Sequence, residues 1–407
     1  MKCRHCNNLL KQTFLDLGYA PPSNSYLNKK DLSKPEIYYP LKIRVCNKCW
    51  LVQTEDYAKA ETFFTPDYAY FSSISSSWLL HAKKYSDKII KELNLNKKSY
   101  VVEIASNDGY LLKNFIKKKI PCLGIEPTKS TADVAKKLKI PVIRKFFTES
   151  LSNKIVRDEK KADLIIGNNV FAHVPDINDF TKGIKVLLKQ GGIVTLEFPH
   201  LMRLIEKRQF DTIYHEHFSY LSLNTISNIF STFGLRIWKV EELATHGGSL
   251  RVYGCHEKDG RPICQSVNKI LKEEVNKGLL KLKTYVNFQK KIDQIKDNFL
   301  SFLIKQKRLS KKIVAYGAAA KGNTLLNFSG VKPDLLPFVF DAAKSKQGKF
   351  LPGSHIPILP PKELTKIKPD FLLILPWNII NEIKFKNPWI KKTKMKLVIA
   401  VPKLLII

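Results

Sequence analysis

The stretch Val101-Val102-Glu103-Ile104-Ala105-Ser106-Asn107-Asp108-Gly109 decides the fold that this sequence predicts. An apolar strand ends here in a turn of small and polar residues. A helix is expected before it, over 78–93, and further strands after it, at 122–126, 163–167 and 192–198, with helical stretches between them. Strands that alternate with helices at this spacing form βαβ units, so the sequence predicts an α/β fold around a parallel sheet.

The chain of 407 residues divides by pattern into four regions. Residues 1–75 are rich in turn formers, and residues 76–265 carry the predicted sheet, which ends in an expected hairpin of 235–241 and 248–256. Residues 266–310 form a Lys-rich helical stretch that we interpret as a solvated helix bridging two domains. Residues 311–407 repeat an α/β pattern and predict a smaller Rossmann-like unit. The strands expected in this unit are 312–316, 336–340, 371–375 and 396–401.

The composition narrows the class of protein. Hydrophobic residues make up 44% of the chain, which is enough for packed cores and excludes a disordered protein. The net charge of +33 raises nucleic acid or an anionic surface as a partner. The basic residues are mostly Lys and are scattered, without an Arg-rich helix or a basic tract with interleaved aromatics. We therefore expect a diffusely basic surface and no nucleic-acid partner. The alternative, a focused electrostatic field that attracts a phosphorylated substrate, stays open.

The two ends of the sequence carry no membrane signal. The first residues lack the apolar segment of a secretion signal, and the apolar run over 397–407 is interrupted and too short to span a bilayer. We expect a cytoplasmic protein without membrane insertion, acting as a monomer.

Two cysteine pairs, Cys3-x2-Cys6 and Cys46-x2-Cys49, predict a metal site. Each pair supplies two thiolates from a tight turn, which suits tetrahedral Zn²⁺. Four sulfur ligands leave no open position for a substrate, so the zinc is expected to be structural. The alternative is two incidental pairs of reduced thiols.

The turn after Glu103 resembles the first motif of class I methyltransferases, in which an acidic residue and a Gly-containing turn hold the amino-acid part of S-adenosylmethionine. Ala105 stands where that motif has Gly. Glu126 ends the next strand and suits the ribose hydroxyls, while the loop over 168–174 would lie over the reactive end of the cofactor. Nicotinamide binding is the rival, but no G-x-G-x-x-G occurs. The residues expected at the cofactor are Glu103, Ala105, Ser106, Asn107, Asp108, Glu126, Asn168 and His173, with an ordinary packed histidine as the alternative for His173.

The run Tyr214-His215-Glu216-His217 follows the strand expected at 192–198 and concentrates groups that can move protons. The two histidines have a spacing that can bind metal, but no second carboxylate–histidine motif completes such a site. A general base, oriented by a neighbouring carboxylate and helped by tyrosyl hydroxyls, fits better. A satisfied polar cluster in the core is the structural alternative.

Two glycine-containing turns follow later in the chain. The turn over 246–251 places His246 and Arg251 beside the sheet edge, either as a plain hairpin turn or to shape a substrate cleft. The segment over 316–323 joins a strand to a helix, and its small residues with Lys321 and Asn323 make a cradle for a diphosphate. Asp341, at the end of the next strand, is a candidate partner for nucleoside or sugar hydroxyls.

Together these pieces resemble the sugar C-methyltransferase family, over nearly the whole chain. They include the double CxxC lobe with its turn over 15–24, the Glu-x-x-Ser-Asn-Asp-Gly loop, the Tyr-His-Glu-His run, the His-Gly-Gly-Ser-Leu-Arg turn and the Tyr-Gly-Ala-Ala-Ala-Lys-Gly segment. The resemblance implies a class I methyltransferase sheet, a zinc-binding amino-terminal lobe and a second Rossmann-like domain. It also implies transfer of a methyl group from S-adenosylmethionine to C-3′ of a nucleotide-linked 4-keto-deoxysugar.

In that family a tyrosine, a glutamate and a histidine of the Tyr-His-Glu-His run line the reaction site, and they fall here on Tyr214, Glu216 and His217. A further tyrosine comes from the amino-terminal lobe, where Tyr68, which we prefer, and Tyr70 are the candidates. Three rival functions stay open at this point: an O- or N-methyltransferase acting on a surface-polysaccharide precursor, a non-catalytic nucleotide-sugar-binding protein, and a nucleic-acid methyltransferase.

Overall fold

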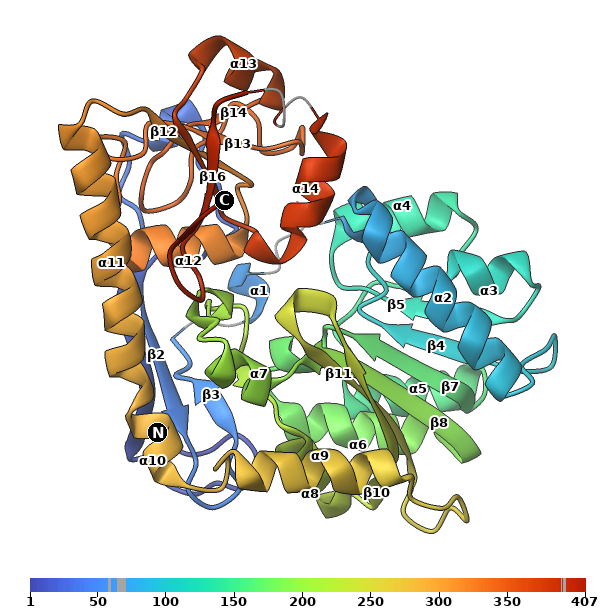
Figure 1. Ribbon diagram of the computed structural model, residues 1–407. Coiled ribbons are helices and arrows are strands. Elements are labelled where there is room, and N and C mark those ends of the chain that lie inside the picture. The colour runs from blue at the N-terminus through green and yellow to red at the C-terminus, as the bar shows by residue number, and fades with distance from the viewer. Residues whose placement is uncertain (58–59, 64–70, 389, 391–392) are drawn as a thin grey trace.

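The computed structural model describes residues 1–57, 60–63, 71–388, 390 and 393–407, and it contains three sheets (Figure 1). The central sheet has the strand order β10-β11-β8-β7-β4-β5-β6, and its last five strands in this order run parallel. The strands are β4 (Val101–Ile104), β5 (Cys122–Ile125), β6 (Val142–Ile143), β7 (Ala162–Asn168), β8 (Leu188–Pro199), β10 (Leu235–Leu243) and β11 (Ser249–His256). The predicted parallel sheet and its terminal hairpin are confirmed.

The central sheet is covered by helices on both faces, which explains why its strands read as continuous apolar runs. Every residue of β4 and β5 is buried. The flanking helices are α2 (Ser76–Glu92), α3 (Lys113–Lys117), α4 (Lys129–Lys137), α5 (Glu149–Asp158), α6 (Ile177–Leu187) and α8 (Leu223–Thr232). Because all parallel strands end at one edge, the turns after β4, β5 and β7 lie together there.

The amino-terminal lobe contains a four-stranded antiparallel sheet, and one of its strands comes from a later part of the chain. Its strands are β1 (Gln12–Ala20), β2 (Tyr39–Val45), β3 (Val52–Thr54) and β9 (Ser219–Tyr220), and the short helix α1 (Ala60–Phe63) follows β3. The edge strand β9 comes from the segment that directly follows His217. The lobe is therefore joined, backbone to backbone, to the region of the Tyr-His-Glu-His run.

The carboxy-terminal domain holds a six-stranded sheet of order β14-β13-β12-β15-β16-β17. Five strands are parallel, but β17 pairs antiparallel with β16, so the sheet is mixed. The strand predicted over 336–340 is also shorter than expected. The strands are β12 (Ile313–Tyr316), β13 (Val339–Phe340), β14 (Ile358–Leu359), β15 (Phe371–Ile374), β16 (Lys396–Ile399) and β17 (Leu405–Ile406), and the helices are α12 (Ala320–Phe328), α13 (Leu364–Ile367) and α14 (Ile380–Lys386).

The prediction of one solvated helix over 266–310 is wrong. The stretch forms three helices, α9 (Gln265–Asn276), α10 (Leu282–Val286) and α11 (Phe288–Arg308), and Gly278 has a positive φ of 79° in the turn after α9. The many lysines hid an apolar stripe at helical spacing. In α11 this stripe buries Phe288, Ile292, Ile295, Phe299 and Phe302.

One apolar core joins the lobe to the carboxy-terminal domain. It contains side chains of β1, β2 and β3, of α7 (Leu201–Glu206), of α11, and of the sheet around β12. In Figure 1 helix α11 runs along both the lobe and the carboxy-terminal domain. These two regions, at opposite ends of the sequence, are therefore packed as one body.

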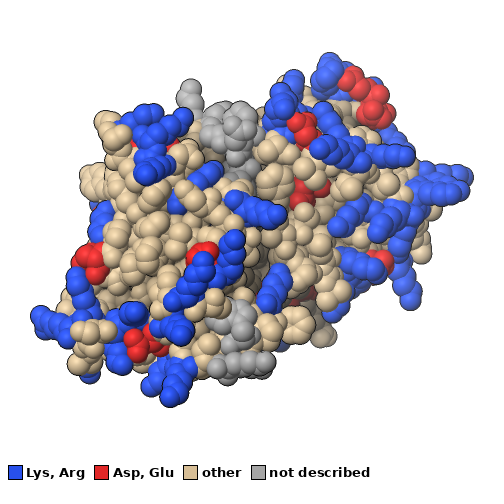
Figure 2. Space-filling view, turned by 90° about the horizontal axis from the view of Figure 1, so that it is seen from above, with Lys and Arg blue, Asp and Glu red and all other residues tan. Residues whose placement is uncertain are grey.

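Basic side chains are spread widely over the face of the molecule that Figure 2 shows. Figure 2 shows Lys and Arg side chains spread over one face, with acidic side chains and uncharged areas between them. No helix among the described residues is both long enough and apolar enough to cross a membrane.

Candidate active site and zinc centre

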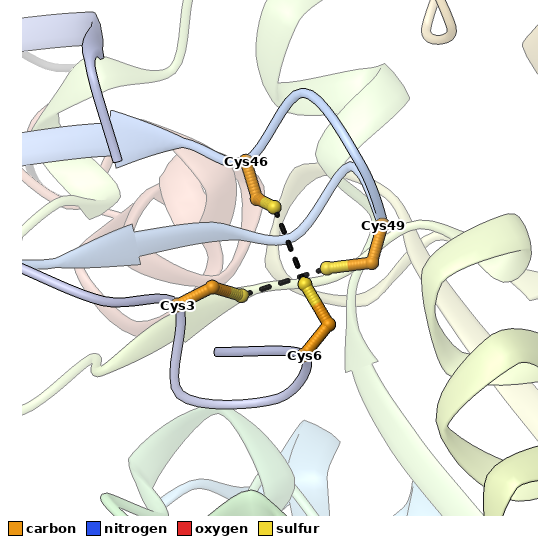
Figure 3. A group of neighbouring side chains, drawn as sticks. All are labelled: Cys3, Cys6, Cys46 and Cys49. Atoms are coloured by element: carbon orange, nitrogen blue, oxygen red, sulfur yellow. Dashed lines mark hydrogen bonds between the residues drawn. The ribbon is translucent and has the colours of Figure 1, made fainter. Parts of the chain in front are cut away.

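The four paired cysteines converge at the base of the amino-terminal lobe (Figure 3). Cys3 and Cys6 come from the first loop, and Cys46 and Cys49 come from the turn between β2 and β3. The Sγ atoms of Cys3 and Cys49 lie 3.5 Å apart, as do those of Cys6 and Cys46. Four thiolates around zinc would lie about 3.8 Å apart, given a Zn–S length of about 2.3 Å.

Backbone and side-chain N–H groups also face this sulfur cluster. The Lys48 amide donates to Cys46 Sγ at 3.4 Å, and the Gln53 side-chain amide donates to Cys3 Sγ at 3.2 Å. Such donors favour thiolates, which are the form that binds metal. The cluster of four cysteines therefore fits a structural zinc ion.

The turn after β4 has the backbone of a ligand cradle. Ala105 and Asn107 have positive φ values of 56° and 49°, and Gly109 follows at 78°. Ala105 thus adopts the left-handed conformation that the motif's glycine would adopt, at a cost of roughly 1–2 kcal/mol. At Gly109 the positive φ favours glycine, and a Cβ atom there would approach Ile140 Cδ1 to 2.4 Å, so the Ile140 side chain would have to move.

Buried polar atoms without partners gather at this turn. Within the described part of the chain, Glu103 Oε2, Ser106 Oγ, Asp108 Oδ1 and both amide atoms of Asn168 have none. Burial raises the pKa of Glu103 well above its usual value, and the nearby carboxylates of Asp108 and Glu126 raise it further. A ligand that brings an ammonium group and hydroxyls would satisfy these atoms and stabilise the acidic cluster. S-adenosylmethionine has both, so the residues fit this cofactor.

Glu126 stands at the end of β5, and its carboxylate already has partners. It accepts hydrogen bonds from the backbone amides of Asn107 at 2.9 Å and Thr128 at 3.0 Å. These contacts tie the β4 turn to the β5 turn. An ionised carboxylate has about four acceptor positions, so bonds to ribose hydroxyls remain compatible with this arrangement.

The run Tyr214–His217 lies between the amino-terminal lobe and the central sheet, and its side chains point in different directions. His217 is buried, and its Nδ1–H donates to the Thr212 carbonyl at 2.8 Å. Its ring lies 4.0 Å from the ring of Tyr214 and 4.6 Å from that of His173, centroid to centroid. His215 instead faces the lobe, where its Nε2–H donates to the Tyr39 carbonyl at 3.2 Å.

The expectation that a carboxylate orients this histidine is therefore wrong, because the Thr212 carbonyl holds the His217 ring instead. The Glu216 carboxylate accepts a hydrogen bond from the side chain of Asn24 in the lobe, at 2.7 Å. His217 and its sequence neighbour Glu216 thus have different hydrogen-bond partners. The two histidines of the run do not share a metal site, and among the described residues only the four cysteines form a cluster suited to a metal.

Burial keeps the imidazoles of this site neutral. It lowers the pKa of His217 well below its usual value of 6.5, and the nearby His173, Lys321 and His246 lower it further because they disfavour a second positive charge beside them. Burial also lowers the pKa of His173 to about 4, and the Nδ1–H of His173 donates to the Glu216 carbonyl at 2.8 Å. With Nδ1 protonated, the basic nitrogen of neutral His217 is Nε2.

The ring of Trp78 contacts both Tyr110, which follows the expected cofactor turn, and His246. Trp78 in α2 lies 6.0 Å from Tyr110, just beyond the β4 turn, and 5.3 Å from His246, in each case between ring centroids. The Asn169 side-chain amide donates to His246 Nε2 at 3.3 Å. Trp78 was not singled out from the sequence, and Asn169 was expected only as part of the loop over 168–174; both contact His246.

A buried ion pair lies beneath this edge of the sheet. Arg251 donates to Glu197, at the end of β8, at 2.5 Å, and His81 lies 2.9 Å from the same carboxylate oxygen. The Arg251 charge is therefore neutralised within the protein. Arg251 therefore takes part in an internal ion pair and does not present a free positive charge.

The carboxy-terminal domain brings further expected residues to the same region. Lys321 Nζ donates to Asn378 at 3.2 Å and lies 4.9 Å from the Trp377 ring. Trp377 in turn donates to Asp211 at 2.6 Å. Asp211 was not singled out from the sequence, although it stands three residues before Tyr214.

The remaining substrate candidates differ in their partners. Asp341 accepts hydrogen bonds from the backbone amides of Ala318 and Ala343, each at 2.7 Å, and so holds the turn between β12 and α12. Asn323 is fully buried, and neither atom of its amide has a partner in the described part of the chain. Tyr68 and Tyr70 lie outside the described residues.

Comparison with known families divides the chain into three parts. Residues 3–64 match a zinc binding domain family, residues 78–240 match a methyltransferase domain family, and residues 244–402 match the C-methyltransferase C-terminal domain family. The C-methyltransferase NovU of Streptomyces niveus is 31% identical over 382 residues, which cover 94% of this chain and 91% of that protein.

Similar solved structures each cover less than half of the chain. A SAM-dependent methyltransferase from Anabaena variabilis shares 16% identity over 44% of this chain and 85% of its own, with a TM-score of 0.35. Magnesium protoporphyrin IX methyltransferase from Synechocystis, with bound SAH, shares 12% identity over 44% of this chain and 82% of its own, with a TM-score of 0.34. At such scores these two structures support no argument about the site.

The family matches agree with the zinc centre and with a methyltransferase domain that contains the β4 turn. They also select methylation of carbon over methylation of oxygen or nitrogen. The chain belongs to the S-adenosylmethionine-dependent C-methyltransferase family with an amino-terminal zinc-binding domain.

Proposed function

We propose that this C-methyltransferase acts on C-3′ of a nucleotide-linked 4-keto-deoxysugar, with His217 as the general base. The arrangement of His217 carries the proposal. Its ring is buried and neutral, its Nδ1–H is held by the Thr212 carbonyl, and a phenol and a second imidazole lie against it. The ring is therefore in the neutral form that can accept a proton at Nε2, which is the form that a general base needs.

The chemistry of the substrate follows from what such a base can do. A ketone at C-4′ acidifies the hydrogen on C-3′, but too little for spontaneous loss at neutral pH. His217 Nε2 takes that proton, directly or through a water molecule, and general-base help of this kind contributes about 10²–10⁴-fold. The electron pair of the broken C–H bond moves into the enolate, whose negative charge rests on the C-4′ oxygen.

Hydroxyl donors near the base stabilise that oxygen. The Tyr214 ring lies 4.0 Å from the ring of His217, centroid to centroid. Tyr68, from the lobe, is proposed as the second phenol, with Tyr70 as the alternative. Donors fixed before the reaction favour the charge that develops in the transition state. The Glu216 carboxylate accepts a hydrogen bond from a sugar hydroxyl and so fixes the ring of the substrate.

The cofactor supplies a methyl group bonded to a positively charged sulfur. Glu103, Ser106, Asp108 and Asn168 hold its polar end, because their buried atoms lack partners within the described chain. Trp78 and Asn169 contact His246, and His246 is close enough to His217 to influence its pKa. Holding two reactants at roughly 3–3.5 Å provides a large part of the rate acceleration.

The nucleotide end of the substrate belongs to the carboxy-terminal domain in this proposal. The N-terminus of α12 attracts phosphate, and Lys321 in its first turn adds a positive charge. Asp341 fixes the backbone amide of Ala318 in the turn that precedes this helix. The amide of Asn323, unpartnered within the described chain, is a further group that a substrate would satisfy.

Two measurements test the proposal. The first follows solvent deuterium uptake at C-3′ of a panel of 4-keto nucleotide sugars, with wild-type protein and with His217→Asn. The second locates the methyl group of the product by NMR after incubation with labelled S-adenosylmethionine. We expect uptake and a new C-3′ methyl with the wild type and neither with the variant. A methyl group on oxygen or nitrogen, or on another carbon, would contradict the proposed reaction.

A further inference from the structure

We propose that Asn24 is a positioning residue, which holds the Glu216 carboxylate in place and connects it to the carboxy-terminal domain. The inference rests on the role of Glu216 in the proposed function. Neither the sequence patterns nor the family matches assign a role to Asn24. It lies in the segment 22–27, which we call the linking segment.

Glu216 is held at both its side chain and its backbone. The Asn24 side-chain amide donates to Glu216 Oε1 at 2.7 Å, and the His173 Nδ1–H donates to the Glu216 carbonyl at 2.8 Å. Glu216 is 2% exposed. A buried carboxylate needs donors of this kind to stay ionised and in one orientation.

The linking segment is fixed to the carboxy-terminal domain rather than to the rest of its own lobe sheet. The Tyr26 hydroxyl donates to the Ala318 carbonyl at 2.7 Å and lies 3.5 Å from Asn24 Oδ1. Leu27 and Phe350 exchange backbone hydrogen bonds at 3.0 and 2.8 Å. These contacts fix the chain directly after Asn24, so its side chain can hold Glu216 in one position.

The linking segment contacts the turn between β12 and α12, which is proposed to bind the nucleotide. The Ala318 carbonyl also accepts a hydrogen bond from Lys346 Nζ at 2.8 Å, and the Ala318 amide donates to Asp341 at 2.7 Å. A continuous set of contacts thus runs from Asp341 through Ala318, Tyr26 and Asn24 to Glu216. Through these contacts the proposed nucleotide-binding turn helps to fix the position of Glu216, which is proposed to bind the sugar.

A double-mutant cycle tests the inference, with kcat and KM measured for Asn24→Ala, Glu216→Ala and the pair. We expect Asn24→Ala to lower kcat about 10-fold to 100-fold, the size of effect produced by a misplaced reactive group, with little change in the KM for S-adenosylmethionine. The double variant should be no slower than Glu216→Ala alone, because Asn24 acts through that carboxylate. A merely structural role would make the two losses multiply.

Two further variants control for folding. Asn28→Ala removes an exposed amide just beyond the same segment, which bonds to the nearby Asp31, and should leave kcat unchanged. Asn24→Asp preserves the shape of the side chain but replaces the donor by a second carboxylate, and should lose activity while keeping zinc content and cofactor affinity.

The outcomes separate the inference from the proposed function. Normal turnover of Asn24→Ala, or losses that multiply in the double variant, would overturn the positioning role and leave the reaction untouched. Normal turnover of Glu216→Ala would overturn both the role of Glu216 in the proposed reaction and the inference built on it.

Discussion

At the scale of single residues, one backbone carbonyl decides which nitrogen of His217 can act. The Thr212 carbonyl holds the proton on Nδ1, and burial keeps the ring neutral. We expect His217→Asn to lower kcat about 10²–10⁴-fold, the usual contribution of a general base, while calorimetry shows unchanged binding of S-adenosylmethionine. His215→Asn is the matched control, since that ring faces the lobe. Comparable losses in both variants would remove the base role from His217.

Asp211 is a second residue whose environment makes a measurable prediction. Burial raises its pKa to about 6, and the nearby Lys321 opposes part of that rise. The ionised carboxylate therefore destabilises the folded state at pH 7. As the pH falls from about 6 towards 4, which is about the ordinary pKa of an Asp side chain, protonation removes this destabilisation. We expect Asp211→Asn, which can still accept from Trp377, to be more stable than wild type above about pH 6.

The stability difference between Asp211→Asn and wild type should shrink as the pH falls through this window. Urea unfolding at several pH values measures it. A difference that is constant from about pH 7 to pH 4.5, or that grows as the pH falls, would show that the Asp211 pKa is not raised.

At the scale of elements, one carboxylate fixes the start of α8. Glu274 in α9 accepts from the backbone amides of Leu223 at 2.6 Å and Asn224 at 2.9 Å, and from His200 at 2.7 Å, and it is fully buried. We expect Glu274→Ala to lower the free energy of unfolding by roughly 3–5 kcal/mol, because two buried donors and one half-buried donor lose their acceptor.

The neighbouring residue on the same helix supplies the control. Glu273 is partly exposed and pairs with Arg203 at 3.1 Å, so Glu273→Ala should cost at most about 1 kcal/mol in denaturant unfolding. Equal costs for the two variants would mean that the cap on α8 contributes nothing beyond a surface ion pair.

The zinc centre acts on the element next to it. Cys46 and Cys49 shape the turn into β3, and β3 pairs with β9, directly after His217. Removing zinc with a chelator should lower the midpoint of thermal unfolding and slow methyl transfer, because β3 loses its anchor. Adding zinc back should restore both. A metal-free protein with an unchanged midpoint and full activity would contradict a structural role for the metal.

At the scale of the whole molecule, the amino-terminal lobe is not independent of the rest. Its sheet takes β9 from residues 219–220, and its apolar core includes side chains of α7, α11 and the carboxy-terminal sheet. We expect a fragment of residues 1–75 with zinc to lack a cooperative unfolding transition, since most of its core partners are missing. Circular dichroism of the fragment, compared with the full chain, measures this. A cooperative transition at the midpoint of the full chain would show that the lobe folds alone.

The sequence by itself determined what depends on local pattern. Strand and helix periodicity predicted the central sheet, and cysteine spacing predicted the metal site, because these signals lie within a few neighbouring residues. The lysines of α11 concealed its buried stripe, so that periodic signal was missed. Only the tertiary structure decided which groups meet across long separations. It placed Asn24 against Glu216 and Trp377 against Asp211. Packing of distant segments sets such contacts, and no local pattern encodes them.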